Sequence, residues 1–227
     1  MNSRRSLPFS SVAAPAVLAV ALTSCSSAEP ESPDVTDVPA GIRIAAAADS
    51  PEQQALAHLY RMAMAEENVA ATVEVRDYPG KDRLQWLLDP EVDMVVGCTG
   101  ELLSHSSPHQ AEELRDEMGG DDSNPNSQEG LERTYETLMG TLGYEYGVPD
   151  PSPAQGCADE VPEDDVLPQS ILPVFRKLSV GREGLKEMNR LTRLITTHDV
   201  ETLVEEVRAS KDARATAEQW YRDNASV

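Results

Sequence analysis

Two short apolar runs constrain the fold of this 227-residue chain more than any other feature. Ile42 to Ala48 is apolar except for Arg43, and Met94 to Val96 is apolar throughout. Continuous runs of this kind are typical of strands that are buried on both faces, as happens where helices cover a mostly parallel sheet. We therefore expect a mixed α/β fold.

Helix signals separate the expected strands. Ser50, Pro51 and Gln53 supply an N-cap, a first-turn proline and the third position of a capping box, so a helix is expected directly after the first run. The segment 72–78 alternates apolar and polar residues, which predicts a strand with one exposed face, and a short helix is expected over 84–88. The order strand, helix, strand, helix, strand predicts right-handed parallel crossovers.

The second half of the chain adds a helix over 131–142, one strand and three further helices. The strand is expected from Ser170 to Lys177, and Pro173 within it predicts an edge position or a bulge, because proline cannot donate to a neighbouring strand. The three C-terminal helices carry apolar stripes that predict core contacts. These stripes are Leu185, Met188, Leu191 and Ile195; Val200, Leu203, Val204 and Val207; and Ala213, Thr216, Ala217 and Trp220.

The N-terminus carries an export pattern. Arg4 and Arg5 precede an apolar stretch, 11–22, that is too short to span a bilayer and predicts a signal peptide over 1–24. The four residues up to Cys25, Leu-Thr-Ser-Cys, match a bacterial lipobox and predict lipidation of Cys25; the alternative is an ordinary cleavage site nearby. The paired arginines leave the general secretory and twin-arginine routes both open.

Residues 25–40 are rich in Ser, Glu, Asp and Pro, which predicts a disordered tether ahead of one folded domain over 41–227. We expect the protein on the extracytoplasmic face of the cell membrane, held by the lipid on Cys25. The chain has 40 acidic and 19 basic residues, a net charge of -21. This charge excludes a nucleic-acid binder, because phosphate backbones select basic surfaces.

Two further cysteines remain if Cys25 is lipidated. In an oxidising compartment Cys98 and Cys157 are expected to form a disulfide. The alternative is a buried free Cys98 and an unpaired Cys157.

The expected ligand site follows from sheet topology. Sites in open α/β sheets lie at the carboxyl ends of strands. Here those ends are Asp49-Ser50 and Thr99-Gly100, and both open helices. Backbone N–H groups, two hydroxyls and the charge of Asp49 predict a site for a small cationic or zwitterionic solute. The alternative is that Ser50 and Thr99 only cap their helices.

One polar loop has spacing similar to a calcium-binding loop. Asp122, Asn124 and Asn126 alternate as the first ligands would, but Ser127 replaces the required glycine and Arg133 replaces the bidentate glutamate. This pattern favours a solvated loop.

A second pattern could be read as a metal or hydrolase site. His105 and His109 are four residues apart, but Pro108 between them interrupts a shared helix, so no metal is expected. The serines around these histidines lack the strained glycine-flanked turn of a hydrolase nucleophile. We expect no cofactor and no enzymatic activity.

Several stretches resemble the glycine betaine/choline type substrate-binding proteins of bacterial ABC importers. The matching features are the turn at Asp49-Ser50, the strand Val92 to Val96 before Thr99-Gly100, and the Leu185 to Leu191 helix followed by Thr196-Thr197. With the segment 134–150 they cover most of the chain after residue 41, in the family's order. The resemblance implies a type II periplasmic-binding fold, non-catalytic solute binding or delivery, and an ABC permease as partner.

The chain departs from that family in two respects. The family has two lobes around a cleft, but the segment 151–166 is too short for a second lobe, so a single lobe is expected. Cation recognition also needs several aromatic faces, and Cys98 stands where the family often has a tyrosine. Four aromatic residues, Tyr60, Trp86, Tyr135 and Trp220, are expected in the core, and Tyr144 and Tyr146 are the weaker cage candidates.

These departures leave a second function open. The chain could be an accessory envelope lipoprotein that binds another protein and has lost small-molecule binding.

Overall fold

The computed structural model describes residues 41–77, 82–119, 124, 127–157 and 167–225. These residues belong to one compact unit, Asp37–Val227. The predicted signal peptide, Cys25 and the tether lie outside the described residues, as do Asp122 and Asn126 of the calcium-like pattern. Among the helices that are described, none is both long and apolar enough to cross a membrane.

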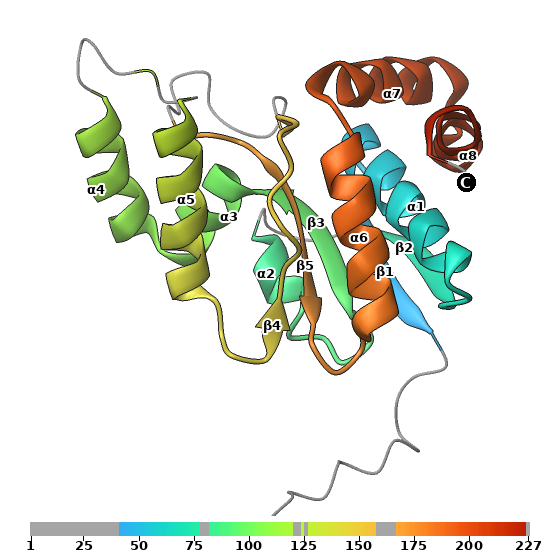
Figure 1. The fold of residues 1–227 in the computed structure, drawn as a ribbon, viewed down its shortest axis with the longest axis horizontal. Coiled ribbons are helices and arrows are strands. Elements are labelled where there is room, and N and C mark those ends of the chain that lie inside the picture. Colours follow the sequence, from blue (N-terminus) through green and yellow to red (C-terminus); the bar gives the residue numbers. More distant parts are fainter. Residues whose placement is uncertain (1–40, 78–81, 120–123, 125–126, 158–166, 226–227) are drawn as a thin grey trace, which may run out of the picture. The chain divides into compact units, whose positions relative to one another are not determined.

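The described residues form a five-stranded sheet with the order β2-β1-β3-β5-β4 (Figure 1). β1 pairs in parallel with β2 and with β3, whereas β5 is antiparallel to both β3 and β4, so only β5 is reversed. The predicted mixed α/β fold with a mostly parallel sheet is confirmed. The strands are β1 (Ile42–Ala47), β2 (Ala71–Arg76), β3 (Met94–Cys98), β4 (Tyr146–Gly147) and β5 (Ile171–Arg176).

Helices cover both faces of this sheet. In β3, Met94 and Val96 contribute to the core on one face and Val95 to the core on the other. This two-sided burial explains the continuous apolar runs. The helices of the first core are α1 (Pro51–Glu66), α6 (Arg182–Leu194), α7 (Thr197–Ser210) and α8 (Ala213–Asn224); those on the other side are α2 (Arg83–Trp86), α3 (Thr99–Ser106), α4 (Pro108–Met118) and α5 (Gln128–Thr141).

Local sequence signals set the helix boundaries. The Ser50 hydroxyl accepts a hydrogen bond from the Gln53 N–H at the start of α1, and Asn68 follows the end of α1 with a φ of 57°. Thr196 and Asp199 form a capping box at α7. The helix expected over 84–88 ends earlier, at Trp86.

The expectation that Pro173 marks an edge strand or a bulge was wrong. β5 lies between β3 and β4, and Pro173 is opposite Val96 in a continuous register. The Arg176 N–H donates to the Asp93 carbonyl, so Arg176 and Asp93 form a hydrogen-bonded pair. Such pairs alternate with non-hydrogen-bonded pairs along antiparallel strands, so Pro173, three positions before Arg176, is in a non-hydrogen-bonded pair and its nitrogen points toward β4. β4 ends at Gly147, before it reaches Pro173, so the proline removes no hydrogen bond between strands.

Candidate functional site

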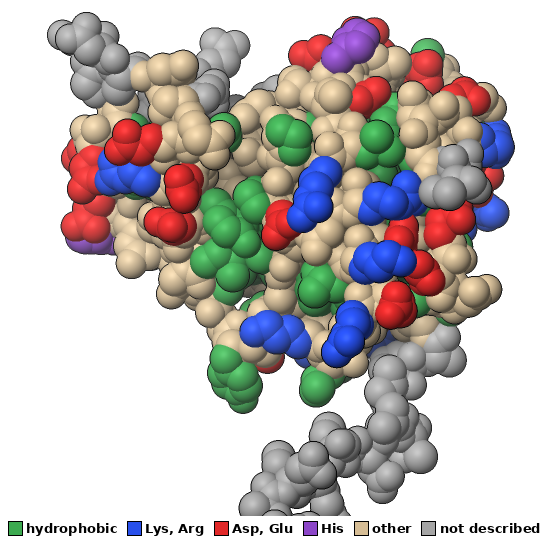
Figure 2. All heavy atoms as spheres, viewed as in Figure 1, with side chains coloured by type: hydrophobic (Ala, Val, Ile, Leu, Met, Phe, Trp, Pro, Cys, Tyr) green, Lys and Arg blue, Asp and Glu red, His purple; other side chains and the backbone are tan. Residues whose placement is uncertain are grey.

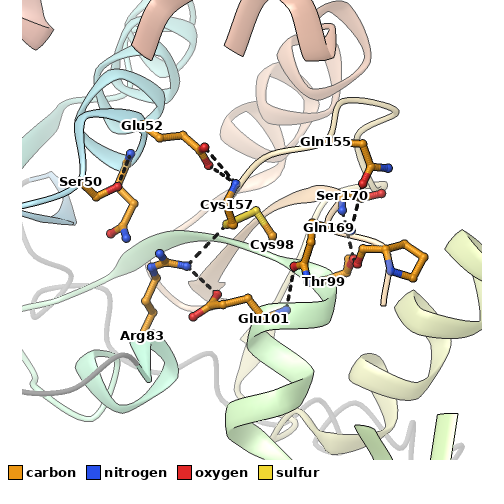
Figure 3. The surroundings of a disulfide bond; sticks show 12 residues. Ser50, Glu52, Arg83, Cys98, Thr99, Glu101, Gln155, Cys157, Gln169 and Ser170 are labelled. Atoms are coloured by element: carbon orange, nitrogen blue, oxygen red, sulfur yellow. Dashed lines mark hydrogen bonds and ion pairs between the residues drawn. A yellow bond between two sulfur atoms is a disulfide. The ribbon is translucent and has the colours of Figure 1, made fainter. Parts of the chain in front are cut away.

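The first turns of α1 and α3 lie together at one edge of the sheet, the edge formed by the carboxyl ends of β1 and β3 (Figure 3). These helices follow β1 and β3, which are neighbouring parallel strands. A carboxylate oxygen of Glu52 and the sulfurs of Cys98 and Cys157 all lie within 4.8 Å of one another. The structure therefore brings together the two helix starts on which the predicted site depends.

The N-terminus of α3 is covered by residues 167–170, which we call the return segment. An α-helix leaves its first N–H groups without partners inside the helix, and these groups are what would hold a ligand. In this structure the first three all donate to the return segment, at distances of 2.9 to 3.0 Å. They run from Thr99 to the Ser170 carbonyl, from Gly100 to the Pro168 carbonyl and from Glu101 to Gln169 Oε1.

Side-chain contacts strengthen this cover. The Thr99 hydroxyl donates to the Pro168 carbonyl at 2.8 Å. A Cβ at Gly100 would lie 2.7 Å from Gln169 Nε2 and 2.8 Å from the Pro168 oxygen, so only glycine permits this close approach. Of the four predicted ligand residues, Ser50, Thr99 and Gly100 are buried and Asp49 is exposed.

A loop that carries Cys157 closes the same edge. The Cys98 and Cys157 sulfurs are 2.06 Å apart, at bonding distance, and so offer no thiolates to a metal. The Cys157 N–H donates to both carboxylate oxygens of Glu52, at 2.8 and 2.9 Å. The loop is therefore fastened to β3 through its sulfur and to α1 through its backbone.

A buried ion pair lies beside the disulfide. Arg83 Nη1 is 2.5 Å from Glu101 Oε2, and the two side chains are 3% and 2% exposed. Burial lowers the pKa of Arg83 and raises the pKa of Glu101, in each case against the attraction of the partner. Arg83 Nη1 also lies 3.8 Å from the Cys157 sulfur.

The two histidines considered as metal ligands belong to different helices. His105 lies in α3, where its Nδ1 is 2.9 Å from the Glu101 carbonyl oxygen. His109 lies in α4, which begins at Pro108, and it faces Glu113 at 3.4 Å with most of its side chain exposed. The interruption expected at Pro108 is present.

The described aromatic residues present no exposed cage at this edge. Tyr60, Trp86 and Trp220 are buried in the core, as predicted, and Tyr135 is half-buried. Tyr144 and Tyr146 lie at the amino end of β4. Because β4 has the same direction as β1 and β3, these two tyrosines lie at the opposite end of the sheet from the first turns of α1 and α3.

Sequence reasoning missed Arg83, Glu52 and the return segment. Glu52 has no local signal beyond its place in the helix start expected at Ser50, and nothing around Arg83 marks it as buried. Their partners are far away in sequence, with 105 positions between Glu52 and Cys157, so a local pattern could not find them.

No family model matches this sequence, and no curated protein matches it significantly. Among solved structures, apo YehZ from Escherichia coli is similar with a TM-score of 0.53 and 10% identity, over 82% of this chain and 99% of that chain. A structure described as a glycine betaine/carnitine/choline ABC transporter is similar with a TM-score of 0.48 and 14% identity, over 80% and 98%. Likeness at these identities shows the fold alone.

Proposed function

We propose that this chain is a lipid-anchored, non-catalytic module of the periplasmic-binding type that binds another envelope protein instead of capturing a small solute. The observation that carries this proposal is the bonding of the first three N–H groups of α3 to the return segment. In open α/β sheets these groups are the ones available to a ligand. In this chain they stabilise the protein's own backbone.

Solute capture for an ABC importer is the second candidate. The exposed Asp49 beside the start of α1 favours it, as does the sequence resemblance to glycine betaine and choline binders. It requires the return segment to leave the first turn of α3, which would break the hydrogen bonds of the Thr99, Gly100 and Glu101 N–H groups and those of the Thr99 hydroxyl. It also requires another lobe or chain to bury the solute, because binding sites enclose most of a small ligand.

The proposed location rests on the lipobox at Cys25. A disulfide between Cys98 and Cys157 fits an oxidising compartment, since such pairs are rare where thiols are kept reduced. An ABC permease is one candidate partner, and any other envelope protein that meets the edge around Asp49 is another.

In-cell photo-crosslinking tests this proposal. A photoreactive residue at Asp49 should give one discrete crosslinked membrane protein, whereas the same residue at Glu205, exposed on α7, should give none. Cys25→Ala should abolish the crosslink by releasing the chain from the membrane. Absence of any crosslink at Asp49, together with micromolar binding of a quaternary amine by the purified chain, would favour the solute receptor.

A further inference from the structure

The two most exposed large apolar side chains of the described residues lie in neighbouring turns. Tyr144 is 92% exposed and Leu178 is 82% exposed. β4 and β5 pair Tyr146 with Arg176, and beyond this pair the Lys177 N–H donates to the Glu145 carbonyl at 2.9 Å, so the turn that holds Tyr144 lies beside the turn that holds Leu178. The Lys177 Nζ donates to the Tyr144 carbonyl at 2.8 Å and joins the two turns.

A third exposed apolar side chain lies in the adjoining turn. Leu88 follows α2 and is 72% exposed. The Arg176 side chain, at the end of β5, donates to the carbonyls of Leu87 and Asp89 and holds this turn beside β5. We call the three side chains the apolar tip: Tyr144, Leu178 and Leu88.

The apolar tip lies at the end of the sheet where the described chain begins. β1 starts at Ile42 and has the same direction as β3 and β4, so Gly41 is at the same end as the turn that precedes β4 (Figure 1). Residues 26–40 connect Gly41 to Cys25 and can span at most about 50 Å. A lipid on Cys25 would keep Gly41, at the same end of the sheet as the tip, within that distance of a bilayer.

The charge around the tip also differs from that of the whole chain. Lys177 and Arg182, which flank Leu178 in the sequence, are exposed, and so are Glu145 and Glu183. Basic and hydrophobic side chains are visible at this end of the face that carries α6 (Figure 2). The turns of Tyr144 and Leu178 thus carry equal numbers of these acidic and basic side chains, and beside Leu88 the acidic Asp89 and Glu91 face Arg76. In a chain of charge -21, this end meets less repulsion from an anionic bilayer than the average surface of the chain.

We propose that the apolar tip docks on the bilayer that carries the anchor, with Tyr144, Leu178 and Leu88 in the headgroup region. Exposed apolar side chains flanked by Lys and Arg are suited to that interface. The proposal rests on the proposed lipid anchor. The anchor limits the distance from the bilayer, whereas the tip sets the orientation. The edge with Asp49 then faces away from the bilayer, where it can meet the part of an envelope protein that extends beyond the membrane surface.

Tryptophan fluorescence on vesicles tests the docking. Leu178→Trp in the purified lipidated chain is placed on phosphatidylcholine/phosphatidylglycerol vesicles with and without brominated acyl chains. The native Trp86 and Trp220 are 2% and 9% exposed, so they give a constant background. The matched control is Val75→Trp, since Val75 is 49% exposed near the carboxyl end of β2.

We expect blue-shifted emission and bromine quenching at position 178, and water-like, unquenched emission at position 75. Quenching at both positions, at neither, or at 75 alone would overturn the proposal. Mass spectrometry of the same preparation separates this outcome from failure of the anchor, because it reports whether Cys25 carries lipid.

If Cys25 carries no lipid, the anchor fails and docking is tested without it. The unlipidated protein is floated with the same vesicles, and serine replaces all three tip residues. Partitioning should fall about tenfold, because the apolar area that would leave water is lost. Val75→Ser serves as control and should have no effect. Unchanged partitioning of the triple variant would overturn the docking.

Discussion

A single backbone N–H, that of Cys157, is held by both carboxylate oxygens of Glu52 at 2.8 and 2.9 Å. Glu52 lies in the first turn of α1, where a carboxylate normally stabilises the positive end of its own helix. Here it also fixes a loop from the other half of the chain. Together with the return segment on α3, this contact closes the edge of the sheet at which α1 and α3 begin.

The Cys98–Cys157 disulfide at this edge should contribute much of the free energy of unfolding. The two cysteines are 59 residues apart, and loop-closure entropy for that length is worth roughly 4 kcal/mol. Cys157→Ser should therefore lower the free energy of unfolding by about that amount in urea titrations without reductant. With dithiothreitol present, wild type and variant should converge. Two titratable thiols in denatured, unreduced wild type, apart from Cys25, would refute the bond.

The Arg83–Glu101 pair should show strong coupling. Glu101→Gln removes the carboxylate that pairs with a guanidinium that is 3% exposed, which should cost about 3 kcal/mol of unfolding free energy. Arg83→Met combined with Glu101→Gln should cost less than the sum of the single changes. Glu117→Gln, which removes an exposed partner of Arg133, should change stability by less than about 1 kcal/mol. Simple additivity at the buried pair would contradict this picture.

Two glycines in helices should respond oppositely to alanine. Gly100→Ala places a Cβ within 2.8 Å of the return segment and should destabilise the protein by about 1–3 kcal/mol. Gly140, in α5, has nothing within 4 Å of its Cβ position, so Gly140→Ala should stabilise by about 0.5–1 kcal/mol. Thermal unfolding of both variants checks the contrast. Stabilisation at both sites would mean that the return segment does not lie on α3.

His58 should make the protein acid-sensitive. Burial lowers the pKa of His58 below 6.5, and Arg61 and Arg214 lower it further, while Glu218 and Asp212 oppose this. The unfolded chain therefore binds more protons below about pH 6.5, and stability falls as the pH drops through that range. His58→Gln should reduce the loss between about pH 7.5 and pH 5 in urea unfolding. His109→Gln, at an exposed site, should leave it unchanged, and equal effects would exclude this mechanism.

Much of the fold could be predicted because its signals are local. Apolar runs define β1 and β3, the serine and proline at 50–51 begin α1, and helical stripes identify α6 to α8. Pro173 was misplaced because its role depends on where β4 ends, which no residue near Pro173 encodes.

The candidate site was less predictable for a similar reason. The helix starts at Asp49-Ser50 and Thr99-Gly100 could be found, but what covers them could not. The Thr99 hydroxyl bonds a carbonyl 69 positions away, and the disulfide loop reaches Glu52 across 105 positions. Such contacts depend on topology, since the reversed β5 brings the chain back across the start of α3.

Calorimetry of the purified chain after Cys25 with glycine betaine and choline tests the central claim most directly. If the N-terminus of α3 is occupied by the protein's own backbone and no second lobe closes over it, a solute finds neither free N–H donors nor burial. We predict a Kd no tighter than about 1 mM, or about -4 kcal/mol, for both compounds. A micromolar Kd for either one would contradict the account and identify the chain as a self-sufficient solute receptor.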